Sequence, residues 1–173
     1  QNNRIEYHLL DATNEKAILA LGLQRFDAVV CHQGIMDMSE IDPLMRGIRQ
    51  VLKPGGRFVF SISHPCFNQS GVTFSIEETT INGELVETYA VKISEYLHPR
   101  PQKGSGIIGQ PVPQYYFDRP LHILFNAAFR AGFALDGLEE PAFTEAQENK
   151  RLLSWTSYRE IPPVLVARLR IFP

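Results

Sequence analysis

The stretch Phe26–Asn68, FDAVVCHQGIMDMSEIDPLMRGIRQVLKPGGRFVFSISHPCFN, decides the fold. It begins with a short apolar run, Phe26–Cys31, that we expect to form a strand buried on both faces. A second β-rich run, Arg57–Ser63, lies near the C-terminal end of this stretch. Between the two runs, apolar residues at helical spacing predict a helix with one apolar stripe: Ile41, Leu44, Met45, Ile48, Val51 and Leu52. Strand, helix and strand in this order predict a βαβ unit with parallel strands.

Residues at both ends of this helix predict where it begins and stops. We expect Asp42 to be the N-cap and Pro43 to be the first helical residue, where its missing N–H costs nothing. The turn Lys53–Gly56 should stop the helix, because proline cannot continue it and glycine allows positive φ.

The N-terminal segment continues the alternation of strands and helices. Arg4–Leu10 is predicted to be a strand, and Glu15–Leu21 a helix with Gly22 as its C-cap. This alternation predicts an open α/β sheet, in which ligands lie beyond the C-terminal ends of the strands. The loops 11–14, 31–38 and 63–68 are therefore the candidate site.

The segment Cys66–Phe117 interrupts the alternation. Asn82-Gly83 is a strong hairpin signal between two β-rich runs, and the residues that follow the hairpin are rich in proline and glycine. Because this segment directly follows a strand's C-terminal end, we expect residues 66–117 to form a lid or substrate-binding cap. A surface insertion without a functional role is the alternative.

The C-terminal third returns to regular elements. Residues 121–129 have helical apolar spacing and are followed by Gly132. Phe133–Leu138 and Val164–Phe172 are predicted strands, which we expect to pair antiparallel at the sheet edge. Thr144–Ser154 is predicted to be partly helical.

Composition limits the class of protein. The chain has 173 residues, 44% hydrophobic and 21% charged, which fits a single domain covering residues 1–173. A net charge of −2 gives no argument for nucleic acid or an anionic membrane as partner. No apolar run approaches the roughly 18 residues of a membrane span. The two cysteines, Cys31 and Cys66, lie in or beside strands, as in proteins of a reducing cytosol, so we expect a cytoplasmic location.

Four short motifs occur in order along the chain: LLDAT (9–13), FDAVVCHQGIMDM (26–38), LKPGG (52–56) and AGF (131–133). Together with the two closing strands, they resemble the class I S-adenosylmethionine-dependent methyltransferases, of the methyltransferase type 11 kind. The resemblance implies a Rossmann-like α/β sheet with a lid insertion after the fifth strand. It also implies S-adenosyl-L-methionine as cofactor and methyl transfer to a small-molecule acceptor.

One departure from the family is large. The Gly-rich loop after the family's first strand, and the acidic residue ending its second, are both missing from this sequence. The match begins at the family's third strand, so the sheet is expected to be incomplete, with its first strands missing. In the family's strand order, 3-2-1-4-5-7-6, Arg4–Leu10 then has no neighbour and Phe26–Cys31 has an unpaired edge. We expect a fragment that is inactive alone, or a homo-oligomer formed through that edge.

The resemblance assigns cofactor contacts to two loops. Asp11 would accept a hydrogen bond from the adenine amino group, with the Ala12 backbone N–H on the ring. A helix N-cap is the alternative role for Asp11. Cys31, His32 and Gln33 would face the ribose and methionine parts of the cofactor, although Cys31 also fits simple buried packing.

Further residues are candidates for the acceptor side. His64, after the second strand of the opening stretch, is the candidate general base or acceptor-orienting group, because imidazole titrates near neutral pH. A histidine that only hydrogen-bonds the backbone is the alternative. Tyr115 and Tyr116 would wall the acceptor pocket, and Arg119 would pair with an acidic substrate group or, alternatively, form a structural ion pair. His64 and Cys66 give only H-x-C, which is no tetrahedral metal set.

Charge on the expected lid suggests a substrate preference. His98, Arg100 and Lys103 make this segment locally basic, which favours an anionic substrate, although surface solubility explains three cations equally well. Two other functions compete with methyl transfer. One is a non-catalytic α/β binding module, and the other is a nicotinamide-dependent oxidoreductase, which also needs a Gly-rich loop.

Overall fold

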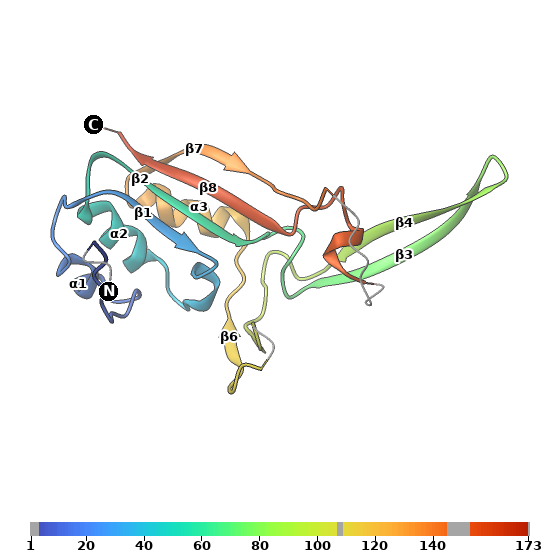
Figure 1. The fold of residues 1–173 in the computed structure, drawn as a ribbon, viewed down its shortest axis with the longest axis horizontal. Helices are drawn as coiled ribbons and strands as arrows, with labels where there is room; N and C mark the ends of the chain where they lie inside the picture. The colour runs from blue at the N-terminus through green and yellow to red at the C-terminus, as the bar shows by residue number, and fades with distance from the viewer. Residues whose placement is uncertain (1–3, 107–108, 145–152, 173) are drawn as a thin grey trace.

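The computed structural model describes residues 4–106, 109–144 and 153–172. A four-stranded sheet in the order β1-β2-β8-β7 organises them (Figure 1). β1 is parallel to β2, whereas β8 is antiparallel to both β2 and β7. The predicted parallel pair and the predicted antiparallel closing pair are therefore confirmed. The strand bounds are β1 Phe26–His32, β2 Leu52–Ser63, β7 Phe133–Glu139 and β8 Val164–Ile171.

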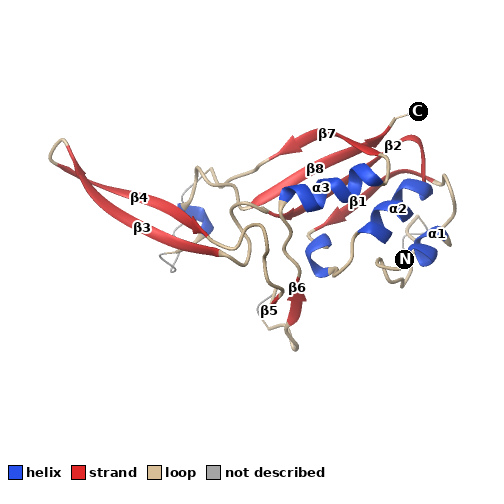
Figure 2. Ribbon diagram, turned by 180° about the vertical axis from the view of Figure 1, so that it is seen from behind, coloured by secondary structure: helices blue, strands red, loops and turns tan. Residues whose placement is uncertain are grey.

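Three α-helices lie on one face of this sheet. Figure 1 shows the sheet in front of α2 and α3, and Figure 2, from behind, shows the helices in front of the sheet. Among the described residues, no helix covers the opposite face. The helices are α1 Glu15–Leu19, α2 Asp42–Val51 and α3 Leu121–Arg130, with short 3₁₀ turns η1 Ile35–Asp37 and η2 Trp155–Ser157.

The core lies between the helices and the sheet. All six residues of the apolar stripe predicted for α2 are buried, and they pack with Phe58 and Phe60 of β2. Burial of each such side chain contributes about 1.5–3 kcal/mol before entropy. α1 packs closely on α2, because a Cβ atom at Gly47 would lie 2.9–3.0 Å from Ile18. The predicted βαβ unit is thus the packed centre of the molecule.

The predicted helix ends are correct within one or two residues. Ile41 is the N-cap of α2 and makes no side-chain capping bond, so Asp42 lies one position inside the helix and Pro43 follows it. α1 ends at Leu19 with Ala20 as C-cap, before the predicted Gly22. α2 ends before the predicted turn Lys53–Gly56, but these residues belong to β2, which begins at Leu52; φ is +74° at Gly55, and the register with β1 shifts between Phe26 and Ala28.

Two predictions for the N-terminal third are wrong. Arg4–Leu10 forms no strand, because the described sheet ends at β1 and no further strand pairs with that edge. β1 was expected to be buried on both faces, yet the Val30 side chain is 71% exposed. Val30 lies in an edge strand, and no described helix covers its face of the sheet.

The segment between β2 and α3 forms two hairpins. β3 (Val72–Ile81) pairs antiparallel with β4 (Glu84–Ile93) around the predicted Asn82-Gly83 turn. This hairpin projects far from the sheet (Figure 1). The short strands β5 (Gln102–Gly104) and β6 (Gln114–Tyr116) form the second hairpin. Ring contacts of 4.8–5.9 Å anchor the base of the long hairpin to the segment before β8, through Phe74, Tyr89, Trp155 and Tyr158.

The remaining elements agree with the sequence where the structure describes them. α3 spans the predicted helix, and β7 and β8 span the two predicted closing strands. The partly helical segment predicted at Thr144–Ser154 lies mostly in 145–152, outside the described residues. None of the described helices has the length and apolar character needed to cross a bilayer.

Candidate functional site

A polar cavity of about 630 Å³ opens beyond the C-terminal ends of β1 and β2. The loops after these two strands form one wall, and the segment that carries both hairpins forms the other. This is the position at which open α/β sheets bind ligands. The cavity is lined by Gln33, Met36, Asp37, Ser63, Asn68, Gln69, Ser70, Gln102, Ser105, Gly106, Gln110, Gln114, Tyr116 and Asp118.

Gln33 stands where β1 leaves the sheet. Its backbone N–H donates to the Ser61 carbonyl at 3.0 Å and lies 3.3 Å from the Ser61 hydroxyl oxygen. Its φ is +50°, an uncommon conformation for a residue other than glycine. The pairing of β1 with β2 therefore fixes this residue at the cavity wall.

Asp37, at the end of η1, presents a carboxylate to the cavity. The Gln114 side-chain amide donates to Asp37 Oδ1 at 3.0 Å, so this bond joins η1 to β6 across the cavity. Burial raises the pKa of the Asp37 carboxyl, and the Gln114 hydrogen bond opposes this rise. A solvent-exposed carboxylate is therefore held at the junction of the two walls.

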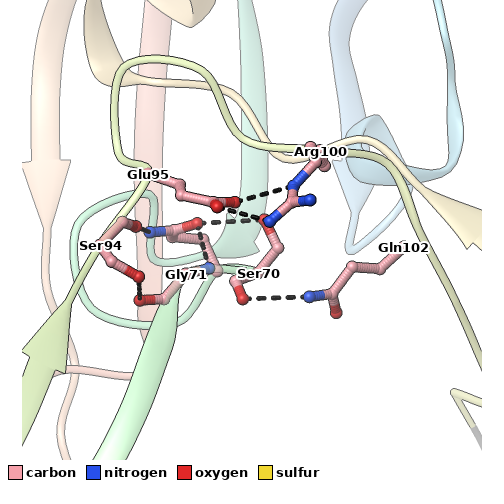
Figure 3. Close-up of polar contacts among 7 residues, drawn as sticks. Ser70, Gly71, Ser94, Glu95, Arg100 and Gln102 are labelled. Carbon is pink, nitrogen blue, oxygen red and sulfur yellow. Dashed lines mark hydrogen bonds and ion pairs between the residues drawn. The ribbon is translucent and has the colours of Figure 1, made fainter.

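The outer wall is tied together by the polar contacts drawn in Figure 3. Ser94 donates to the Gly71 carbonyl from its N–H at 2.8 Å and from its hydroxyl at 3.0 Å. Only glycine fits at residue 71, since a Cβ atom there would lie 1.7 Å from the Ser94 carbonyl oxygen. The Gln102 amide donates to the Ser70 carbonyl at 3.0 Å. These bonds hold the base of the long hairpin against β5.

Arg119 attaches the loop after β1 to the start of α3. Its guanidinium donates to the carbonyls of Phe117 at 2.8 Å, Ile35 at 3.3 Å and Ser39 at 2.9 Å, and also to that of Met38. Arg119 does not line the cavity. The structure thus places it as a structural arginine, although its partners are backbone carbonyls instead of the carboxylate of an ion pair.

His64 also lies outside the cavity lining. Its side chain is buried, and its Nε2 lies 2.7 Å from Glu140 Oε1. Its Nδ1 accepts the Cys66 backbone N–H at 3.1 Å, so the neutral ring carries its proton on Nε2. Both ring nitrogens are therefore engaged, one of them by a side-chain carboxylate, so His64 is not a histidine that only hydrogen-bonds the backbone, and its role as general base stays a prediction.

The two tyrosines of β6 have different surroundings. Tyr116 lines the cavity, whereas Tyr115 is half exposed and lies under Lys103, whose Nζ is 5.5 Å from the ring centre. Arg100 forms a bidentate ion pair with Glu95. Arg100 and Lys103, two of the three cations that made this segment locally basic, thus have other partners, and the described cavity lining contains two carboxylates and no cation.

The cavity residues that sequence reasoning missed are mostly amides and carboxylates. Their positions, from 37 to 118, are brought together only by the two hairpins and η1. The one available signal was the recurrence of glutamine at 102, 110 and 114 within a segment poor in periodic apolar residues.

The sequence and fold of this chain are similar to those of known proteins. Residues 1–60 match the model of a methyltransferase domain family. An S-adenosylmethionine-dependent methyltransferase from Mesorhizobium loti is 25% identical, with a TM-score of 0.60 over 86% of this chain and 64% of that one. The fold is that of the S-adenosylmethionine-dependent methyltransferases. The chain spans 64% of the length of that Mesorhizobium loti methyltransferase.

Two more distant structures support the same fold. A protein from Listeria monocytogenes assigned as an S-adenosylmethionine-dependent methyltransferase has 19% identity and a TM-score of 0.62, covering 91% of this chain and 67% of that one. The [4+2]-cyclase SpnF has 16% identity and a TM-score of 0.53, covering 99% of this chain and 58% of that one. A search of curated proteins found no match.

The observed strand order agrees with the methyltransferase fold. The order β1-β2-β8-β7 follows the 4-5-7-6 part of the order that the resemblance implied. The residues that were expected to hold the cofactor nevertheless lie in three separate places. Asp11 lines a hollow beside α1 and α2, His32 lines an apolar hollow on the open sheet face, and Gln33 lines the polar cavity.

The residues expected to bind the cofactor have the following local contacts. Asp11 Oδ1 accepts the Thr13 N–H at 2.9 Å and its hydroxyl at 2.7 Å, and Asn14, not Asp11, caps α1. Ala12 packs against the core. Cys31 also packs against the core, and burial raises the pKa of its thiol, as the packing alternative expected. The His32 ring bonds Ser61 at 2.7 Å through Nδ1, so Nε2 faces away from this bond.

These residues fit the methyltransferase cofactor in part. Asp11 keeps an exposed carboxylate oxygen for an exocyclic amine, and Gln33 stands at the strand end. The sequence contains no Gly-rich loop in the position that would cradle the methionine moiety. No group of three or more His, Cys, Asp and Glu side chains suited to a metal occurs among the residues that the structure describes.

Proposed function

We propose that this chain forms the acceptor side of an S-adenosylmethionine-dependent methyltransferase that acts on a small polar molecule. The observation that carries the proposal is the polar cavity at the C-terminal ends of β1 and β2, within a methyltransferase fold. A volume of about 630 Å³ suits a small-molecule ligand.

The chemistry asks for positioning and for exclusion of water. Methyl transfer is an in-line displacement: the acceptor's lone pair forms a bond to the methyl carbon, and the carbon–sulfur bond breaks with its electron pair going to sulfur. S-adenosylmethionine, when bound, supplies the methyl group. No covalent nucleophile is needed, so a wall of hydrogen-bonding side chains that holds the acceptor suffices.

The cavity lining suits the positioning role. Gln33 and Ser63 come from the strand ends, and Gln102, Gln114 and Tyr116 come from the opposite wall. Amides and hydroxyls donate and accept, so together they can orient a polar acceptor. We propose that the segment 66–117 is the lid that shields this acceptor from water.

The cofactor side is proposed to lie toward the free edge of β1. Asp11 is exposed beside α1 and α2, and β1 is the edge strand of the described sheet, so a loop that cradles the methionine moiety would pack at this edge. For this reason we expect the 173-residue chain alone to bind S-adenosylmethionine too weakly for calorimetry, and micromolar binding would contradict this division of roles.

The test is calorimetric titration with S-adenosylhomocysteine of this chain joined to a segment that supplies the methionine-binding loop, which is called the native protein below. We expect micromolar binding that Asp11→Ala weakens at least tenfold, because the variant loses a hydrogen bond of about 1.5–3 kcal/mol to an ionised group. Glu78→Gln on the projecting hairpin is the matched control and should bind like wild type. Absence of binding by the native protein would contradict the proposed function.

The second candidate is a non-catalytic binding module, favoured by the missing Gly-rich loop. The fold alone does not decide between the two functions, since SpnF, a [4+2]-cyclase, also resembles this chain. A native protein that binds a ligand in the polar cavity but does not bind S-adenosylhomocysteine would support the module.

A further inference from the structure

We propose that the acceptor is a small polar amine whose ammonium form binds the Asp37 carboxylate, and which loses a proton to water before its nitrogen lone pair can accept the methyl group. The inference rests on the proposed function, because it names the substrate class of the same cavity. It replaces the anionic substrate that the basic residues of the expected lid had suggested.

The charges on the cavity wall favour a cation. Among the described lining residues, the ionised side chains at neutral pH are Asp37 and Asp118, and there is no lysine, arginine or histidine. An anion would therefore enter a site with two carboxylates and no partner for its own charge, which is unfavourable. A neutral polar ligand would supply no cation to either carboxylate.

The two carboxylates have different surroundings. Asp118 Oδ2 accepts the Ser70 backbone N–H at 2.8 Å, and its charge interacts with the guanidinium of Arg119. Asp37 has the neutral amide of Gln114 as its hydrogen-bond donor. Arg119 approaches η1 through the carbonyls of Ile35 and Met38, and the structure records no ion pair between Arg119 and Asp37. Asp37 is thus the carboxylate whose charge lacks a cation.

Asp37 also retains capacity for a ligand. Gln114 donates to Oδ1, and an ionised carboxylate has about four lone-pair sites on its two oxygens. An ammonium N–H can therefore bind while the Gln114 bond stays in place. Asp37 is exposed to solvent, and the partial desolvation that raises the pKa of its carboxyl is opposed by the Gln114 hydrogen bond. A ligand can therefore reach this carboxylate, and a bound ammonium would favour its ionised form.

The other residues that line the cavity favour a polar amine rather than an apolar one. The amides of Asn68, Gln102 and Gln110, with the Tyr116 hydroxyl, offer donors and acceptors around the carboxylate. An amine that also carries hydroxyl or amide groups would satisfy them, whereas an alkyl chain would leave them unpaired. The predicted ligand class is therefore a hydroxylated or amidated amine.

The test uses two matched sets of probes with the 173-residue chain. Ethanolamine, ethylene glycol and glycolate form the small set, and glucosamine, glucose and glucuronate form the larger set. Each set varies ammonium, hydroxyl and carboxylate on a similar frame. Binding is measured by NMR, from chemical-shift changes of backbone amides at the cavity, near neutral pH. The variants are Asp37→Asn, which keeps an acceptor for Gln114, and Glu78→Gln, an exposed hairpin control.

We expect at least one amine to bind at least tenfold more tightly than its hydroxyl and carboxylate counterparts, and Asp37→Asn to abolish this preference. Glu78→Gln should preserve it. The proposal is overturned if no amine shifts the cavity amides, if a carboxylate binds as well as its amine, or if Asp37→Asn retains the preference. Because no probe contains S-adenosylmethionine, these results do not depend on cofactor binding, so failure of this inference and failure of the proposed function remain distinguishable.

Discussion

Arg119 offers the sharpest test of how the cavity wall is held. Its guanidinium donates to four backbone carbonyls, three of them in the loop after β1, and so attaches that loop to the start of α3. Arg119→Met keeps the aliphatic stem but removes every donor. The bonds to Ile35, Phe117 and Met38 are partly buried, and a lost bond of this kind costs about 1 kcal/mol. We therefore expect Arg119→Met to lower the free energy of unfolding by about 3 kcal/mol.

Arg100 supplies the matched control. It is also an arginine with a bidentate partner, but its side chain is 80% exposed and pairs with Glu95 at the surface. Surface ion pairs contribute about 0–1 kcal/mol, so Arg100→Met should change stability by less than that. Urea unfolding followed by circular dichroism measures both variants, with wild type beside them.

The comparison separates a structural role for Arg119 from a substrate-binding role. If Arg119→Met is as stable as wild type while ligand binding falls, the structural reasoning is refuted and the substrate role returns. Arg119→Lys should lie between wild type and Arg119→Met, because lysine keeps the charge but cannot reach the same carbonyls with a planar fork.

Three further predictions concern packing, charge and the sheet edge. Gly47→Val should lower unfolding free energy by about 1–3 kcal/mol in urea titrations, because its side chain would overlap Ile18; unchanged stability contradicts the close packing. Partial burial raises the pKa of Asp37 above its ordinary 3.8, which means that the folded protein favours the protonated carboxyl. The free energy of unfolding of the wild type therefore falls as pH rises through the pKa of the folded state. The stability of Asp37→Asn relative to wild type should therefore increase with pH, and a constant difference would refute this. Light scattering should show species larger than 19.6 kDa, formed through the free edge of β1, whereas a stable monomer excludes edge pairing.

Local periodicity predicted most of the regular elements. Residues close together in the sequence were enough to predict the apolar stripe of α2, the strands β2 and β8, and the Asn82-Gly83 hairpin. Their side chains fix both the element and the face that it buries. The antiparallel pairing of β7 with β8 was also predictable, because no helix was required between them.

Other predictions failed because they depend on a partner that local sequence does not contain. Arg4–Leu10 has a strand-like composition, but a strand needs a neighbour and the sheet ends at β1. Val30 belongs to an apolar run, yet its exposure is set by what covers the sheet. In each case the local pattern is typical of a strand, and the tertiary context decided the outcome.

The candidate site was the least predictable part. Position at a strand's C-terminal end singled out Gln33, which lines the cavity, and equally His64, which contacts Glu140 and Cys66 and does not line it. Asp37 and Gln114 are far apart in the sequence and meet through the fold of the hairpin segment. Nothing in either local sequence indicates this contact.

The most direct test of the central claim is a crystal structure of the native protein with S-adenosylhomocysteine. The account predicts that its sulfur atom faces the polar cavity, with Gln33 between the sulfur and the strand ends and with Asp37 on the acceptor side. A sulfur atom in the apolar hollow beside Val30, or one facing the His64 ring, would contradict the account.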